Sequence, residues 1–188
     1  MKKVIAIVGR ARSGKDTSAD YVAEKLGCNK HALATPLKEL VCAMFEIDME
    51  TLDDYKNEGF RLKAQRLDKE TYAIAEYPVD VSFRHILQRC GDAQKNLFGL
   101  GVYMQKLAEK MHDEDTVVIS DVRLLEEQKW LQQNVDVTFI KITRHAEIGH
   151  DSRHRTEKEV DSLAYDYIIN NNGTKAELYA KIDTILNN

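Results

Sequence analysis

A short segment near the amino terminus has the residue types needed to bind phosphate. It reads Gly9-Arg10-Ala11-Arg12-Ser13-Gly14-Lys15-Asp16-Thr17, and its glycines and lysine have the spacing GxxxxGK. The glycines let the backbone curl so that N–H groups point inward around a phosphate. Lys15 adds a mobile positive charge that can reach the β- and γ-phosphates. The sequence therefore predicts an ATP-binding loop made by Arg12, Ser13, Gly14, Lys15, Asp16 and Thr17.

The residue after the lysine departs from the usual form of this loop. Asp16 stands where a Ser or Thr normally binds Mg²⁺, and Thr17 follows one place later. With a threonine two places after the lysine, this loop resembles that of the nucleoside monophosphate kinases. This likeness favours a small-molecule kinase over a GTPase or a motor ATPase. It leaves the Mg²⁺ ligand open between Asp16, Thr17 and a water molecule held by Asp121.

A second carboxylate and a cation follow an apolar run later in the chain. Asp121 comes directly after residues 116–120, and Arg123 lies two positions further on. A carboxylate at the end of such a strand, beside a phosphate loop, holds Mg²⁺ directly or through water. The alternative is that Asp121 only caps the helix expected from about Leu124.

Residues 144–159 are rich in charge and follow another predicted strand. Arg144, Arg153 and Arg155 are the candidates here for stabilising the charge of a transferring phosphoryl group. A lid in this place could close over ATP and exclude water. The alternative is an ordinary solvated loop.

The elements that would position these residues alternate along the chain. Short apolar runs rich in β-branched residues predict buried strands at 4–8, 30–34, 116–120, 137–143 and 167–169. Apolar residues at helical spacing predict helices over about 19–26, 37–44 and 178–185. Alternation of this kind predicts an α/β fold of the P-loop NTPase type, with a mainly parallel five-stranded sheet flanked by helices.

Two stretches interrupt the alternation. Residues 46–82 are polar, and we expect a helical insertion there that binds the acceptor. Residues 144–159 are the expected lid. No linker or repeat separates parts of the chain, so the prediction is one kinase domain over residues 1–188 with these two insertions.

Composition excludes several classes of protein. The 188 residues are 43% hydrophobic and 31% charged, with a net charge of −4, which argues against general binding to nucleic acid or to anionic membranes. The three cysteines, Cys28, Cys42 and Cys90, form no CxxC pair and are expected to be free thiols. No apolar run approaches the length of a membrane span. We expect a cytoplasmic protein and leave its oligomeric state open, a homodimer included.

Several short motifs together resemble the deoxynucleoside monophosphate kinases of tailed bacteriophages. They lie at residues 11–17, 34–38, 84–88 with 91–92, 120–123, 154–157 and 171–174. The resemblance implies a P-loop kinase with a monophosphate-binding insertion and a lid. It places these residues around the acceptor: Lys38, Arg84, Gln88, Asp92 and Glu157. Animal-type phosphomevalonate kinases share some of the same motifs.

The expected reaction is Mg²⁺-dependent transfer of the γ-phosphoryl group of ATP to a deoxynucleoside 5′-monophosphate. Lys15 would hold the donor and Asp121 would organise Mg²⁺. The expected cations for the transferring group are Arg123, Arg144, Arg153 and Arg155. Two alternatives remain: a kinase for another phosphorylated acceptor such as phosphomevalonate, and a nucleotide-binding switch that transfers nothing.

Overall fold

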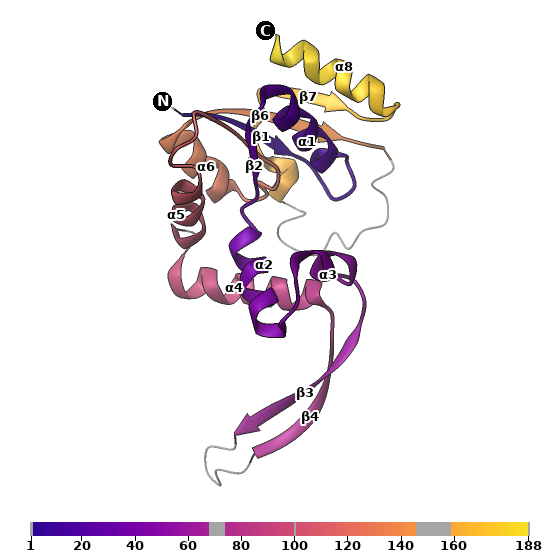
Figure 1. The fold of residues 1–188 in the computed structure, drawn as a ribbon, viewed down its shortest axis with the longest axis vertical. Helices are drawn as coiled ribbons and strands as arrows, with labels where there is room; N and C mark the ends of the chain where they lie inside the picture. Colours follow the sequence, from indigo (N-terminus) through magenta and orange to yellow (C-terminus); the bar gives the residue numbers. More distant parts are fainter. Residues whose placement is uncertain (1, 68–73, 100, 146–158, 188) are drawn as a thin grey trace. The chain divides into compact units, whose positions relative to one another are not determined.

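The computed structural model describes residues 2–67, 74–99, 101–145 and 159–187. The chain forms two compact units (Figure 1). Unit 1 comprises residues 1–34 and 100–188, and unit 2 comprises residues 35–99. The predicted single domain is thus divided, and unit 2 is larger than the predicted insertion of residues 46–82.

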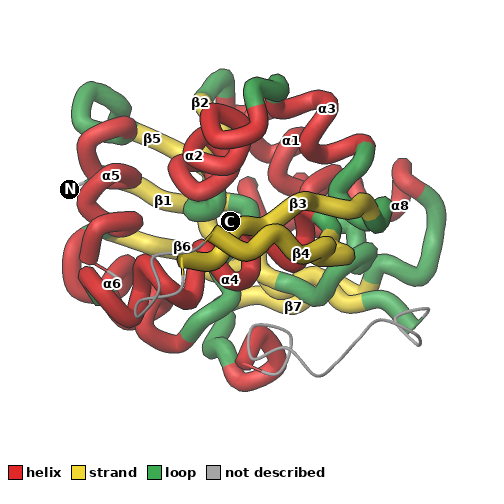
Figure 2. Tube along the Cα trace, turned by 90° about the horizontal axis from the view of Figure 1, so that it is seen from below, coloured by secondary structure: helices red, strands yellow, loops and turns green. Residues whose placement is uncertain are grey.

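Unit 1 is built on a five-stranded parallel sheet, as predicted. The strands lie in the order β2-β5-β1-β6-β7, which can be followed in Figure 2. Their bounds are β1 Lys3–Val8, β2 Asn29–His31, β5 Thr116–Ile119, β6 Asp136–Thr143 and β7 Tyr167–Asn170. All five correspond to the strands expected from the apolar runs.

Both faces of this sheet are covered, which explains why its strands are apolar on both sides. Val4 and Ala6 of β1 pack with helices α5 (Gly101–Lys110) and α6 (Leu125–Asn134), next to the short helix η1 (Val160–Ser162). Ile5 and Ile7 point to the other face and pack with α1 (Lys15–Leu26) and α8 (Lys175–Leu186). Alternate residues of one strand therefore serve two separate cores.

The described residues of unit 2 form three helices and a two-stranded hairpin. The elements are α2 Thr35–Phe45, α3 Met49–Asp54, β3 Phe60–Leu67, β4 Ile74–Val81 and α4 Phe83–Phe98. Its small core contains Val41, Leu52, Phe83 and Leu87, with Phe60 at the base of the hairpin packed against them. Phe60 and Phe83 lie with their ring centroids 4.8 Å apart.

The prediction of a helical insertion over residues 46–82 is wrong for most of its length. Among the described residues of this range only α3 is an α-helix, and β3 pairs with β4 in an antiparallel hairpin (Figure 1). The period-two alternation explains this: Leu62 and Val79 are half-buried, whereas Arg61 and Asp80 are exposed and pair across the strands. Neither strand has a second neighbour among the described residues, so Pro78 costs no bond in a central strand.

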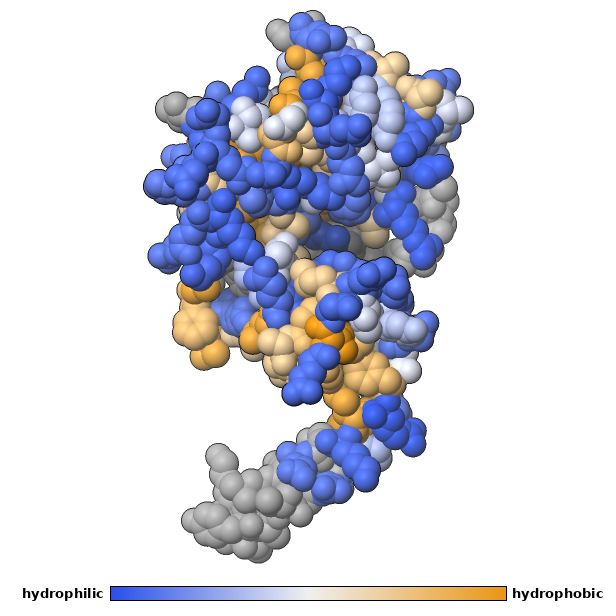
Figure 3. All heavy atoms as spheres, in the orientation of Figure 1, coloured by the Kyte–Doolittle hydropathy of each residue, from blue (hydrophilic) through white to orange (hydrophobic). Residues whose placement is uncertain are grey.

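Both units carry exposed apolar side chains, and the three most exposed large ones among the described residues lie in unit 2. On the face shown in Figure 3, hydrophilic atoms cover most of unit 1, and hydrophobic atoms gather on unit 2. Met44 of α2 is 60% exposed, and Leu97 and Phe98 at the end of α4 are 75% and 64% exposed. Within the described ranges, no helix has the length and apolar character to cross a membrane.

Candidate active site

The phosphate loop joins the end of β1 to the first turn of α1. Gly9 has no room for a side chain, because a Cβ there would lie 2.6 Å from the backbone oxygen of Ile142. Gly14 has φ +98°, in the left-handed region that favours glycine. Arg12 also has a positive φ of 64°, and its side chain is exposed. The loop therefore curls as the spacing predicts, and Lys15 is the first residue of α1.

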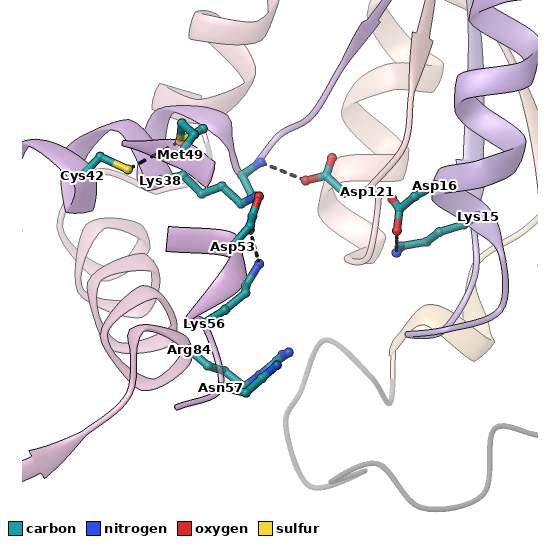
Figure 4. A network of polar contacts seen from close by, with 11 residues as sticks. Lys15, Asp16, Lys38, Cys42, Met49, Asp53, Lys56, Asn57, Arg84 and Asp121 are labelled. Carbon is teal, nitrogen blue, oxygen red and sulfur yellow. Dashed lines mark hydrogen bonds and ion pairs between the residues drawn. The ribbon is translucent and has the colours of Figure 1, made fainter. Parts of the chain in front are cut away.

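Lys15 is the buried cation of this loop. Its side chain is only 7% exposed, and its Nζ lies 2.8 Å from Oδ2 of Asp16 (Figure 4). The Asp16 side chain is 67% exposed. Only the Asp16 side of this part-buried ion pair is open to solvent, so an incoming phosphate can compete with the Asp16 carboxylate for Lys15.

Ser13 supplies a polar atom that the described part of the protein leaves unsatisfied. Its Oγ is buried and has no hydrogen-bond partner among the described residues. A buried hydroxyl without a partner costs about 1–3 kcal/mol. Its location inside the phosphate loop fits a site that a phosphate oxygen would complete.

Asp121 lies just beyond β5, and its carboxylate holds a turn of unit 1. Oδ1 accepts from the backbone N–H of Leu33 at 2.6 Å, and Oδ2 accepts from that of Ala34 at 2.9 Å. Helix α6 is capped instead by Glu127, whose Oε2 accepts from the N–H groups of Arg123 and Leu124. Asp121 therefore fixes the end of the β2–α2 connection, and its role toward Mg²⁺ stays a prediction.

Unit 2 carries a separate group of cations, which we call the cation cluster: Lys38, Lys56 and Arg84. Nζ of Lys38 lies 2.7 Å from both carboxylate oxygens of Asp53, and Nζ of Lys56 lies 3.3 Å from Oδ1 (Figure 4). Arg84 is joined to this group because its backbone N–H donates to the oxygen of Lys56 at 2.9 Å. One carboxylate thus faces more positive charge than it can neutralise.

The ionisation of these groups reflects the crowding of charge. Burial lowers the pKa of Lys56 below its ordinary value, and the charges of Lys38 and Arg84 lower it further, against the effect of Asp53. Burial raises the pKa of Asp53, but the hydrogen bond and charge of Lys38, with those of Lys56, outweigh this and hold it below its ordinary value. Both shifts reflect burial and the close contact of two lysines with one carboxylate, a grouping of cations that suits a phosphate.

The remaining predicted acceptor residues lie on α4 at intervals of four. Arg84, Gln88 and Asp92 therefore share one side of this helix. The guanidinium Nε of Arg84 donates to Oδ1 of Asn57 at 2.7 Å. Gln88 is half-buried and Asp92 is exposed. The structure thus brings Lys38 and Arg84 into one cluster and places Gln88 one turn from it.

Comparison with known proteins identifies the family. The model of the deoxynucleotide monophosphate kinase family matches residues 3–79 and 65–182, which together cover nearly the whole chain. The protein belongs to the deoxynucleotide monophosphate kinase family. It is therefore a phosphotransferase, and the resemblance expected from the short motifs is confirmed. A nucleotide-binding switch that transfers nothing is not supported.

Relatives of this kinase agree with the assignment. It is 28% identical to the “Putative deoxynucleotide monophosphate kinase” of Acanthamoeba polyphaga mimivirus, over 98% of this chain and 96% of that one. Among solved structures, it resembles shikimate kinase from Aquifex aeolicus (13% identity, TM-score 0.51, 98% of this chain and 96% of that one). It also resembles dephospho-CoA kinase from Campylobacter jejuni (15% identity, TM-score 0.51, 100% and 96%). These likenesses confirm the P-loop kinase fold.

The predicted lid of the kinase, residues 144–159, is described only at its two ends, residues 144–145 and 159. Arg144 is exposed directly after β6. Arg153, Arg155 and Glu157 lie outside the described residues. Arg123 is half-buried between β5 and α6. The roles assigned to these side chains stay predictions.

The loop residues suit Mg²⁺, which P-loop kinases generally use with ATP. Asp16 and Thr17 offer hard oxygen donors in the first turn of α1, next to Lys15. The described ranges hold no group of three or more candidate metal-ligating side chains. This is compatible with Mg²⁺ at a nucleotide site, where waters and phosphates complete the coordination.

Sequence reasoning missed Lys56 of the cation cluster and Asp53, the carboxylate that it contacts. A signal was available, because Asp53 and Lys56 are separated by three positions, a spacing at which ion pairs form on helices. It also assigned no role to Asn171, whose side chain contacts the phosphate loop.

Proposed function

We propose that this kinase transfers the γ-phosphoryl group of ATP to a deoxynucleoside 5′-monophosphate, giving ADP and the diphosphate. The observation that carries the proposal is the cation cluster of unit 2. It is a second site with excess positive charge, built from other elements than the phosphate loop. A kinase with a phosphorylated acceptor has two anions to bind, whereas one with an uncharged acceptor has only the donor.

The donor would bind to the phosphate loop of unit 1. Backbone N–H groups of the loop and the amino-terminal end of α1 would surround the β-phosphate, and Lys15 would exchange Asp16 for a phosphate oxygen. Ser13 Oγ would donate its proton to the same ligand. Mg²⁺, held next to Asp16 and Thr17, would neutralise part of the charge on the phosphates.

The acceptor phosphate would bind to Lys38, Lys56 and Arg84. These cations would orient it and reduce its repulsion from ATP. The acceptor oxygen is already negatively charged at pH 7, so the reaction needs no general base. Gln88 has an amide that can pair with the edge of a base. The family match favours a nucleotide over phosphomevalonate as this acceptor.

The test is ADP release by the purified full-length protein with Mg-ATP and a panel of acceptors. The panel contains each dNMP, the corresponding ribonucleotides and phosphomevalonate. We expect strong stimulation by one or more dNMPs. Stimulation by phosphomevalonate alone would retain the fold and reject the proposed acceptor. Removing Mg²⁺ with an excess of EDTA should stop turnover, and activity unchanged by EDTA would reject the proposed metal dependence.

A further inference from the structure

The connection between β7 and α8 lies against the phosphate loop, although the two segments are far apart in sequence. Nδ2 of Asn171 donates to the backbone oxygen of Ser13 at 2.8 Å, and both residues are buried. The backbone N–H of Asn171 donates to the oxygen of Thr143 at 2.7 Å, at the end of β6. Asn171 is thus fixed by a neighbouring strand and is directed at one peptide group of the loop.

The contact leaves no space for any side chain at Gly14. A Cβ on Gly14 would lie 2.2 Å from Nδ2 of Asn171. Packing and the hydrogen bond therefore act on the same peptide unit, the one that joins Ser13 to Gly14.

The direction of that peptide unit determines what the loop offers to a ligand. In a planar trans peptide the C=O and N–H bonds point in opposite directions, and the chain has no cis peptide bonds among the described residues. When Asn171 holds the Ser13 oxygen on its own side, the N–H of Gly14 must point away from Asn171. Inward-pointing N–H groups are what a phosphate-binding loop requires.

We propose that Asn171 is a positioning residue that holds the Ser13–Gly14 peptide in its phosphate-binding orientation. It touches no substrate and acts through the loop backbone. The inference rests on the proposed binding of ATP to this loop. It predicts that loss of the Nδ2 donor weakens ATP binding while binding of the acceptor is retained.

The next residue provides a matched control. Oδ1 of Asn172 accepts from the backbone N–H of His145 at 2.8 Å, so Asn172 uses its oxygen where Asn171 uses its nitrogen. Asn172→Asp keeps an accepting oxygen, whereas Asn171→Asp removes the donor. Both substitutions add the same charge at adjacent positions.

The experiment measures ATP binding to the full-length variants by calorimetry, with KM for ATP, KM for the dNMP and thermal unfolding as further readouts. Asn171→Asp should weaken ATP binding about tenfold or more. It removes one hydrogen bond between neutral groups, and the new carboxylate repels the backbone oxygen of Ser13. Asn171→Ala should weaken it about tenfold without the added charge. Asn172→Asp should stay within about twofold of the parent.

Three outcomes would overturn the proposal. One is a lower unfolding temperature for Asn171→Ala with unchanged ATP affinity, since that describes a purely structural contact. Another is equal weakening by Asn172→Asp, which would assign the effect to charge. The third is an equal rise of KM for ATP and dNMP. Failure of the parent protein to bind ATP would be a different result, because it would reject the proposed function itself.

Discussion

The phosphate loop of unit 1 and the cation cluster of unit 2 both suit a phosphate, but they are built in different ways. The loop offers mainly backbone groups, and a side chain 158 positions away holds one of its carbonyls. The cluster offers long side chains. Lys38 and Lys56 pair with Asp53 over 15 and 3 positions, and Arg84 contacts Asn57 over 27 positions. A backbone site is rigid before its ligand arrives, whereas lysine side chains lose rotamer entropy when they become ordered. We therefore expect the loop to be the more preorganised of the two proposed phosphate sites.

Lys15→Ala should have the largest effect and should test whether the two sites are independent. Lys15 is the buried cation of the loop, so its loss should lower kcat by about 10³-fold, near the upper range for removing one preorganised group. Binding of the dNMP to unit 2, measured by calorimetry, should be retained. Loss of dNMP binding together with activity would contradict the independence of the two sites.

Gly14→Ala should test the rigidity of the loop. The new Cβ would collide with Asn171 in a left-handed backbone conformation, so we expect unfolding free energy to fall by about 1–3 kcal/mol and ATP affinity to fall with it. Gly59→Ala is the control, because a Cβ there meets nothing within 4 Å. Urea unfolding and ATP titration of both variants give the comparison. Normal ATP affinity in Gly14→Ala would show that the loop adapts and is not rigid.

The same difference explains how much the sequence could predict. The loop was predictable because its glycines and Lys15 stand within a few positions, and the five strands were predictable from apolar runs. Asn171 was recognised only as part of a motif, because its contact with Ser13 depends on strand β7 entering the sheet beside β6. The hairpin was missed because charged residues alternate with apolar ones along β3, so the segment was interpreted as a polar stretch and its period-two pattern around Leu62 was overlooked.

Lys56→Met should sharpen the description of the acceptor site. Removing one of the cations while keeping its aliphatic length should raise KM for the dNMP about tenfold. This is the loss of affinity expected when one charge-assisted hydrogen bond is removed. KM for ATP should not change. Lys63→Met, at an exposed position on β3, is the matched control. Steady-state kinetics with each substrate varied in turn measure both constants. An unchanged dNMP KM would remove Lys56 from the site.

Asp53→Asn should have the smallest effect, and it should show how the cluster is held together in the absence of substrate. The pKa of Asp53 is lowered in the folded protein, so its ionised form stabilises the fold above the ordinary pKa of aspartate. That stabilisation is lost as the pH falls through the lowered pKa. Because the side chain is 49% exposed, screening limits the effect to less than about 1 kcal/mol.

Urea unfolding of the parent and of Asp53→Asn at pH 7 and at a series of lower pH values measures this contribution. The parent should be the more stable at pH 7, because the variant leaves the positive charges of Lys38 and Lys56 without their shared carboxylate. The difference should shrink as the pH falls through the lowered pKa of Asp53, because the protonated carboxyl resembles the amide. Inorganic phosphate should stabilise the variant more than the parent at pH 7, since phosphate can then replace the missing negative charge. Equal stabilisation of both proteins by phosphate would show that Asp53 does not share its cations with an anionic ligand.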